Sequence, residues 1–170
     1  TRQVSSAASD VYKRQDKRPF FSENHSLFDV KGMSFFYIVN TRRIGGAPDY
    51  DCSTYTSVME EHCKKSEVGI NDIDHAIRYT LQNESFDFGF LGASEADEKF
   101  SKGKDFYSFR LRKNFKDLTL GYLGTKTDRP ILLRKADVHS FDFTYLPNDK
   151  TRIDTIYDFS DVSQNNLLNK

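Results

Sequence analysis

The chain has 170 residues, of which 37% are hydrophobic and 29% are charged, and its formal net charge is zero. No apolar run approaches the roughly 18–20 residues that span a bilayer, so the sequence predicts a soluble chain with no membrane-spanning helix. The length suits one domain with its own core, and fifteen Phe and nine Tyr residues favour sheet, because aromatic side chains suit half-buried pleated surfaces.

The first 32 residues divide into two segments of different character. Residues 1–15 resemble translated library-adapter sequence or form a polar disordered tail, and they are set aside in predicting the fold. If they are adapter sequence, the native start is either missing or at Met33. Residues 16–32 carry apolar side chains without a clear period. They are either an extended arm that packs on the body or read-through sequence, and the residues leave both alternatives open.

One strand and two helices are predicted next. Residues 33–40 are nearly all apolar and predict a buried central strand, followed by a loop over 41–50. Apolar residues at i, i+3, i+4, i+7 and i+8 predict a helix over 53–66. A second stripe predicts a helix over 71–83, with Asn71 as its N-cap.

From Ser85 the apolar period changes to two, which is typical of half-buried strands. A polar loop is expected over 93–104 and a turn over 124–130. Strands are predicted over 86–90, 106–112, 118–123, 131–135, 141–146 and 153–159, with turn residues Pro147, Asn148 and Asp149 between the last two. Short turns favour antiparallel pairing. The expected fold is therefore α+β, with two N-terminal helices packed on one face of a curved, mainly antiparallel sheet of about five to seven strands. It forms a single domain over 33–160, followed by a polar tail over 161–170.

Two cysteines, Cys52 and Cys63, lie eleven positions apart. If both lie on one helix they are too far apart to bridge, so no disulfide is expected, and a reducing, cytoplasmic setting follows. Together with His62 and His75 they match no common zinc spacing. The sequence therefore predicts no metal site and no cofactor.

The neutral total charge conceals a basic block. Residues 102–136 hold ten bases and three acids, and the flanking segments are acidic. Either these cations form one face that binds a polyanion, with aromatic side chains interleaved, or they pair with acidic residues across the strands. The candidate ligand-binding residues are Arg42, Arg43, Arg110, Arg112, Arg129 and Arg134.

Three functions remain open. The first is a non-enzymatic binding or interaction protein of microbial or phage origin, which holds a protein partner or a polyanion such as nucleic acid on a charged aromatic sheet face. The second is a small RNA- or DNA-acting enzyme, with His139 as general base and Arg134 or Lys135 as anion stabiliser. The third is a structural protein whose sheet edges pair between copies.

Overall fold

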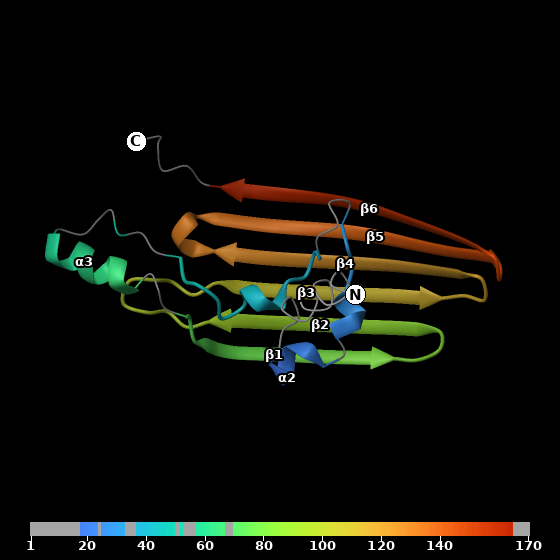
Figure 1. Cartoon of the computed structure of the whole chain (residues 1–170), viewed down its shortest axis with the longest axis horizontal. Helices are drawn as coiled ribbons and strands as arrows, with labels where there is room; N and C mark the ends of the chain where they lie inside the picture. Colours follow the sequence, from blue (N-terminus) through green and yellow to red (C-terminus); the bar gives the residue numbers. More distant parts are fainter. Residues whose placement is uncertain are drawn as a thin grey trace, which may run out of the picture.

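The protein is built around one six-stranded antiparallel sheet, in which every strand pairs with the next one along the chain (Figure 1). This computed structural model describes residues 18–23, 25–32, 37–49, 52, 57–66 and 70–164. The strands are β1 (Ile73–Gln82), β2 (Phe86–Glu95), β3 (Asp105–Asn114), β4 (Leu118–Arg129), β5 (Arg134–Asn148) and β6 (Thr151–Gln164). The antiparallel sheet expected from the sequence is thereby confirmed.

The last hairpin shows why short turns produce this order. Strands β5 and β6 pair along their length, for example His139 with Phe159 and Tyr145 with Ile153. The side chain of Asn148 accepts a hydrogen bond of 3.0 Å from the backbone N–H of Lys150. An Asn that bonds to the backbone two residues on stabilises a tight turn, so this part of the fold is largely local.

The helix expected over residues 71–83 is wrong, because this segment forms strand β1. The predicted stripe, Ile73, Ala76, Ile77, Thr80 and Leu81, has the spacing of a helix, but Ile77, Tyr79 and Leu81 also alternate as in a strand. The branched and aromatic side chains of β1 favour strand, and β2 supplies a hydrogen-bonding partner along its length. Asn71, expected to cap the helix, is buried and donates to Glu95 instead.

The other expected helix is present as α3 (Ser57–Ser66), but among the described residues no layer of helices packs on the sheet. Helix α3 lies beyond the ends of the strands, at the end where β1 begins (Figure 1). Helix α2 (Pro19–Ser22) is a single turn. In the described parts of the chain, no helix is long and apolar enough to cross a membrane.

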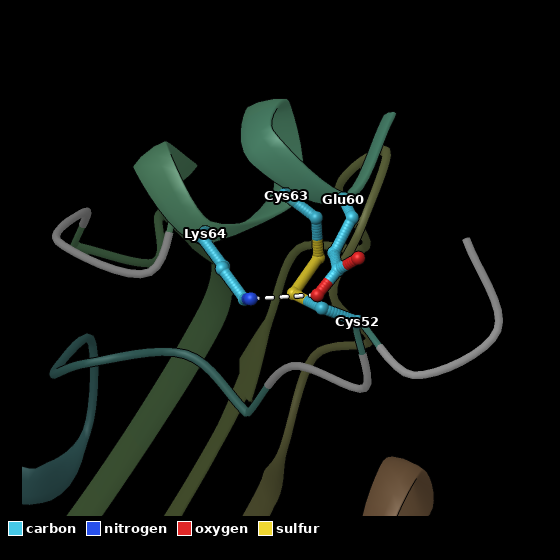
Figure 2. Close-up of a disulfide and its surroundings, with 4 residues drawn as sticks. All are labelled: Cys52, Glu60, Cys63 and Lys64. Carbon is cyan, nitrogen blue, oxygen red and sulfur yellow. Dashed lines mark hydrogen bonds and ion pairs between the residues drawn. A yellow bond between two sulfur atoms is a disulfide. The ribbon is translucent and has the colours of Figure 1, made fainter. Parts of the chain in front are cut away.

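Cys52 and Cys63 form a disulfide, so the expectation of no disulfide is wrong (Figure 2). That expectation placed both residues on one helix. Cys52 instead precedes α3, which begins at Ser57, and the two Cα atoms lie 5.8 Å apart. Disulfides rarely persist in a reducing cytosol, so the cysteines no longer support a cytoplasmic location.

One face of the sheet, which we call the covered face, packs against the N-terminal segment, by which we mean the described residues 18–23, 25–32 and 37–49. That segment contributes α2, the 3-10 turns η1 (His25–Phe28) and η2 (Thr41–Arg43), and extended stretches. Gly89 of β2 allows the close approach, because a Cβ atom there would lie 2.7 Å from the Phe28 ring and 2.8 Å from Leu27. The buried core consists of Phe21, Leu27, Phe28, Val30, Val39, Ile44, Leu91, Ala93 and Leu123.

The central strand expected over residues 33–40 is not part of the sheet in its described portion. Tyr37 makes an isolated antiparallel bridge with Lys31, and residues 33–36 lie outside the described residues. Residues 1–17 and 165–170, which include the adapter-like segment, lie outside them as well.

Two connections differ from the expected loops. Strand β2 continues through Glu95 into the expected loop over 93–104, and β4 continues through the expected turn over 124–130. In β4, Thr125 and Thr127 alternate with charged residues and pair with the start of β5, so the segment has both the alternation and the partner of a strand. The short strand expected over 131–135 is the 3-10 turn η3 (Pro130–Leu132) followed by the start of β5.

Candidate functional site

The face of the sheet away from the N-terminal segment, which we call the open face, is aromatic and aliphatic along all six strands. Residues paired across antiparallel strands point to the same side, so the register defines the face. Its central side chains are Ile77, Tyr79, Leu81, Phe86, Phe88, Phe90, Tyr107, Phe109, Leu111, Leu118, Leu120, Tyr122, His139, Phe141, Phe143, Tyr145, Ile153, Tyr157 and Phe159.

Many of these large apolar side chains are exposed. Tyr157 is 64% exposed, Ile77 59% and Phe141 47%. The rings also contact one another from β1 to β6, in the pairs Tyr79–Phe88, Phe88–Phe109, Phe109–Tyr122, Tyr122–Phe141 and Phe141–Phe159, with centroids 5.0–6.4 Å apart. Such ring pairs hold the side chains in place, so the open face is a pre-ordered apolar surface.

His139 belongs to this aromatic surface. Its ring stacks on Phe159 at 4.7 Å, and its Nδ1 atom forms a hydrogen bond of 2.7 Å with the Tyr122 hydroxyl. Arg134 lies on the covered face, whereas His139 lies on the open face. Lys135 is four residues from His139 along β5, so their Cα atoms lie roughly 13 Å apart. The structure therefore does not bring together the histidine and the cations of the enzyme hypothesis.

Arg110 and Arg112 lie on the covered face in ion pairs. Arg110 binds the carboxylate of Asp142 through both terminal nitrogens, one of them at 3.0 Å. Gly121 makes this possible, because a Cβ atom there would clash with the Asp142 carboxylate. Arg112 Nε donates to Asp87 at 2.6 Å.

Arg129 and Arg134 also lie on the covered face. Arg129 donates to both carboxylate oxygens of Asp49, at 2.8 and 2.5 Å. These hydrogen bonds lower the pKa of Asp49 below its usual value and raise the pKa of Arg129. Arg134 is half-buried opposite Gln164.

Arg42 and Arg43 are exposed on η2, away from the strands that carry the other candidate arginines. The Arg18 side chain holds the loop around them by binding two of its backbone carbonyls. Arg18 donates to the carbonyl of Ile44 at 2.7 Å and to that of Thr41 at 2.8 Å. The six candidate arginines therefore do not form one exposed cationic patch.

Acidic neighbours also neutralise lysines of the basic block. Lys126 lies 3.9 Å from Asp137, and Lys135 lies 2.9 Å from Asp128, which raises the pKa of Lys135. Both pairs join β4 to β5. The cross-strand interpretation of the basic block therefore describes this part of the sheet.

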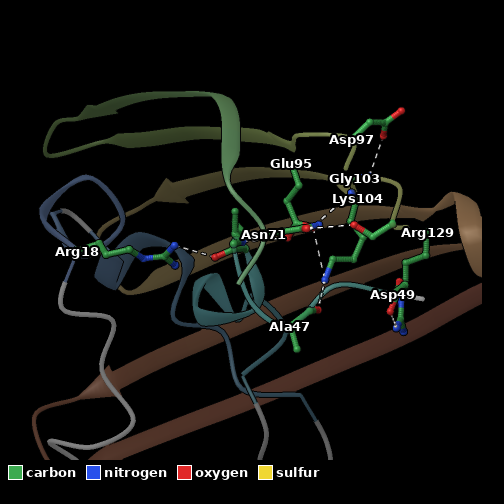
Figure 3. A network of polar contacts seen from close by, with 12 residues as sticks. Arg18, Ala47, Asp49, Asn71, Glu95, Asp97, Gly103, Lys104 and Arg129 are labelled. Atoms are coloured by element: carbon green, nitrogen blue, oxygen red, sulfur yellow. Dashed lines mark hydrogen bonds and ion pairs between the residues drawn. The ribbon is translucent and has the colours of Figure 1, made fainter. Parts of the chain in front are cut away.

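A buried polar network holds the loop over residues 41–49 on the sheet (Figure 3). The fully buried carboxylate of Glu95 accepts hydrogen bonds of 2.9 Å from the Gly45 N–H and from Asn71 Nδ2, and it pairs with Lys104 Nζ at 3.5 Å. Lys104 Nζ also donates to the Ala47 carbonyl at 2.8 Å. The sequence did not predict this network, because Glu95 was assigned to a polar loop. The only signal in the sequence was that the strand alternation of residues 86–90 could continue to residue 95, which places Glu95 on the covered face.

A hollow of about 810 Å³ lies on the covered face, between residues 26–31, Tyr37 and strands β3–β6. Its walls carry charges of both signs, including the Arg110–Asp142 pair and the neighbours Arg152 and Asp154. Arg152 donates to Asp154 at 2.7 Å and lowers the pKa of that carboxyl. Because the charges are paired, the hollow does not select strongly for anions or for cations.

Among the described residues, no cluster of His, Cys, Asp and Glu has the arrangement of a metal site, and the two cysteines are bonded to each other. The open face is therefore the most prominent candidate site. No protein-family model, no curated protein and no solved structure matches this chain.

Proposed function

We propose that the chain is a non-enzymatic binding protein, which holds a protein partner on the open face. The observation that carries this proposal is the continuous apolar surface across six strands, with exposed rings on both edge strands and in the centre. Soluble monomers rarely expose contiguous apolar patches larger than a few hundred Å², and larger patches commonly mark interaction sites.

A protein partner fits this surface better than a polyanion. The centre of the open face carries no lysine or arginine, and Lys126 and Lys135 at its end already have acidic neighbours. Nucleic-acid binding gains most of its affinity from cations that neutralise phosphates. Interface cores, in contrast, are enriched in aromatic residues and depleted in charge.

The proposal is tested by panning a random peptide library on the immobilised wild-type chain at low density. The selected peptides are expected to be rich in apolar residues and to lose binding to Phe141→Lys, which places a charge in the middle of the open face. They should retain binding to Tyr37→Lys, a matched control. Tyr37 is also exposed, at 47%, but it lines the hollow on the covered face.

Peptides that bind Phe141→Lys as well as the wild type would contradict the proposal. A fluorescence-anisotropy titration with short RNA and DNA at two salt concentrations tests the polyanion alternative. Little salt-dependent binding is expected, and strong binding that weakens as salt rises would favour the polyanion instead.

A further inference from the structure

We propose that the open face packs against the open face of a second copy of the chain, which produces a dimer built as a two-sheet sandwich. This inference rests on the proposed function, because it identifies the partner of the same surface. Two sheets packed face to face, about 10 Å apart, are a common way for antiparallel sheets to bury an apolar face.

The size of the open face suits such a dimer. Six strands about 4.8 Å apart, with three or four apolar open-face positions each at a spacing of about 6.6 Å (two residues), make an apolar area of roughly 600 Å². Inclusion of the polar strand ends extends the face to roughly 950 Å². A stable interface buries about 800 Å² on each partner, so two copies have enough surface for a standard interface.

The charges of the open face are arranged to accept a second copy. Lys113 lies at one end of β3, and Asp105 lies at the other end on the same face. Phe109 is midway between them. A two-fold axis near Phe109, perpendicular to the strands, places Lys113 of each copy over the end that carries Asp105 of the other.

The remaining charges at that end leave it mildly acidic, because Asp161 lies on the same face opposite Asp137. Lys126 with Asp137, and Lys135 with Asp128, are neutralised within one chain. Each copy therefore presents an apolar centre, one cationic end and one mildly acidic end, which is self-complementary under the two-fold rotation.

The N-terminal segment does not obstruct this packing, because it lies on the covered face. The contacts of Gly89 with Leu27 and Phe28 place the segment on that side, and α3 lies beyond the strand ends (Figure 1). Among the described residues, the apolar core built with the N-terminal segment contains none of the open-face side chains.

Sedimentation velocity over a concentration series tests the dimer with the full chain. The wild type is expected to shift from monomer to dimer. Phe141→Lys and Tyr157→Lys should each raise the dimer dissociation constant roughly a hundredfold, because each buries an unpaired charge. Tyr37→Lys, on the side of the covered face, should leave that constant unchanged, and circular dichroism verifies that every variant is folded.

A charge exchange tests the orientation. Lys113→Asp alone and Asp105→Lys alone should each weaken the dimer, and the double variant should restore it, because both copies then carry the exchanged pair. If both single variants weaken the dimer and the double variant does not restore it, the proposed two-fold arrangement is overturned.

A measurement on the wild type alone needs no variant. Tyr79 and Tyr157 are 57% and 64% exposed in one chain, so chemical nitration should modify them in dilute solution and spare them at high concentration. Equal nitration of these tyrosines at both concentrations would contradict the dimer.

The outcomes also separate this inference from the proposed function. A wild type that stays monomeric, or a dimer unaffected by both Phe141→Lys and Tyr157→Lys, overturns the second copy as partner. A monomer that still selects apolar peptides sensitive to Phe141→Lys leaves the binding function standing. A monomer that selects no such peptides overturns both.

Discussion

The two faces of the sheet are built by the same six strands, yet their side chains contact different partners. On the covered face, small residues leave space for the N-terminal segment, and the buried charges find partners. On the open face, large aromatic and aliphatic side chains contact one another, but no described element covers them.

This difference shows that stability and binding can be divided between two sides of one sheet. Side chains of the covered face are removed from solvent when the chain folds. Many side chains of the open face are removed from solvent only when a partner binds. The two sides therefore predict different responses to equivalent substitutions, and these responses test the division.

The largest difference in the free energy of unfolding is expected when a buried carboxylate and an exposed carboxylate are each neutralised. Glu95→Gln on the covered face removes the charge that compensates buried Lys104, and should lower the free energy of unfolding by about 3–5 kcal/mol. Asp137→Asn, in an exposed pair at 3.9 Å, should change it by less than about 0.5 kcal/mol. Urea denaturation measures both, and similar losses for the two variants would remove the distinction.

Two leucines of β4 provide a matched apolar pair. Leu123 is fully buried on the covered face, and Leu120 is 42% exposed on the open face. Leu123→Ala should cost about 2–5 kcal/mol through lost burial and a cavity. Leu120→Ala should cost less than about 1 kcal/mol at protein concentrations where the chain is monomeric. An equal cost for the two in dilute solution would show that the open face is covered within one chain.

The disulfide defines a third region, outside both faces. Cys52→Ser/Cys63→Ser should loosen the attachment of α3, with a cost of about 3 kcal/mol to local opening for a loop of this length. Hydrogen exchange should increase in α3 and stay unchanged in β2 and β4, because α3 lies beyond the strand ends (Figure 1). Faster exchange across the whole sheet would mean that α3 supports the core.

The smallest effect concerns acid. Arg129 lowers the pKa of Asp49 in the folded chain below the unfolded value of about 3.8, so the pair stabilises the fold above that value. This contribution, at most about 1 kcal/mol, is lost as the pH falls through the folded pKa. Asp49→Asn should therefore be less stable than wild type at pH 7 and lose less stability on acidification. Thermal denaturation from pH 7 to pH 2.5 measures this, and parallel curves would contradict it.

Part of the fold follows from local patterns. Alternation from Ser85 onward predicts the strands, and the turn residues near Asn148 predict the last hairpin, because both signals come from residues close in sequence. The same kind of pattern misleads over 71–83, where the apolar stripe has helical spacing although the segment is a strand. There the pairing of β1 with β2 decides the outcome.

The candidate site shows the same limit. The sequence by itself identifies an aromatic, charged group of strands and a basic block between acidic segments. It does not show which side of each strand is covered, because alternation only separates the two sides. The tertiary structure decides this by placing Leu27 and Phe28 against Gly89.

The tertiary structure also decides which acidic residue each cation pairs with. Arg110 meets Asp142, and Arg129 meets Asp49, across 32 and 80 positions of the chain. Such pairs depend on strand register and on the path of the N-terminal segment, which no local pattern encodes. The sequence alone thus determined most of the strands after Ser85 and the total charge. Only the packing of distant segments decided that one face is neutralised and buried while the other remains aromatic and open.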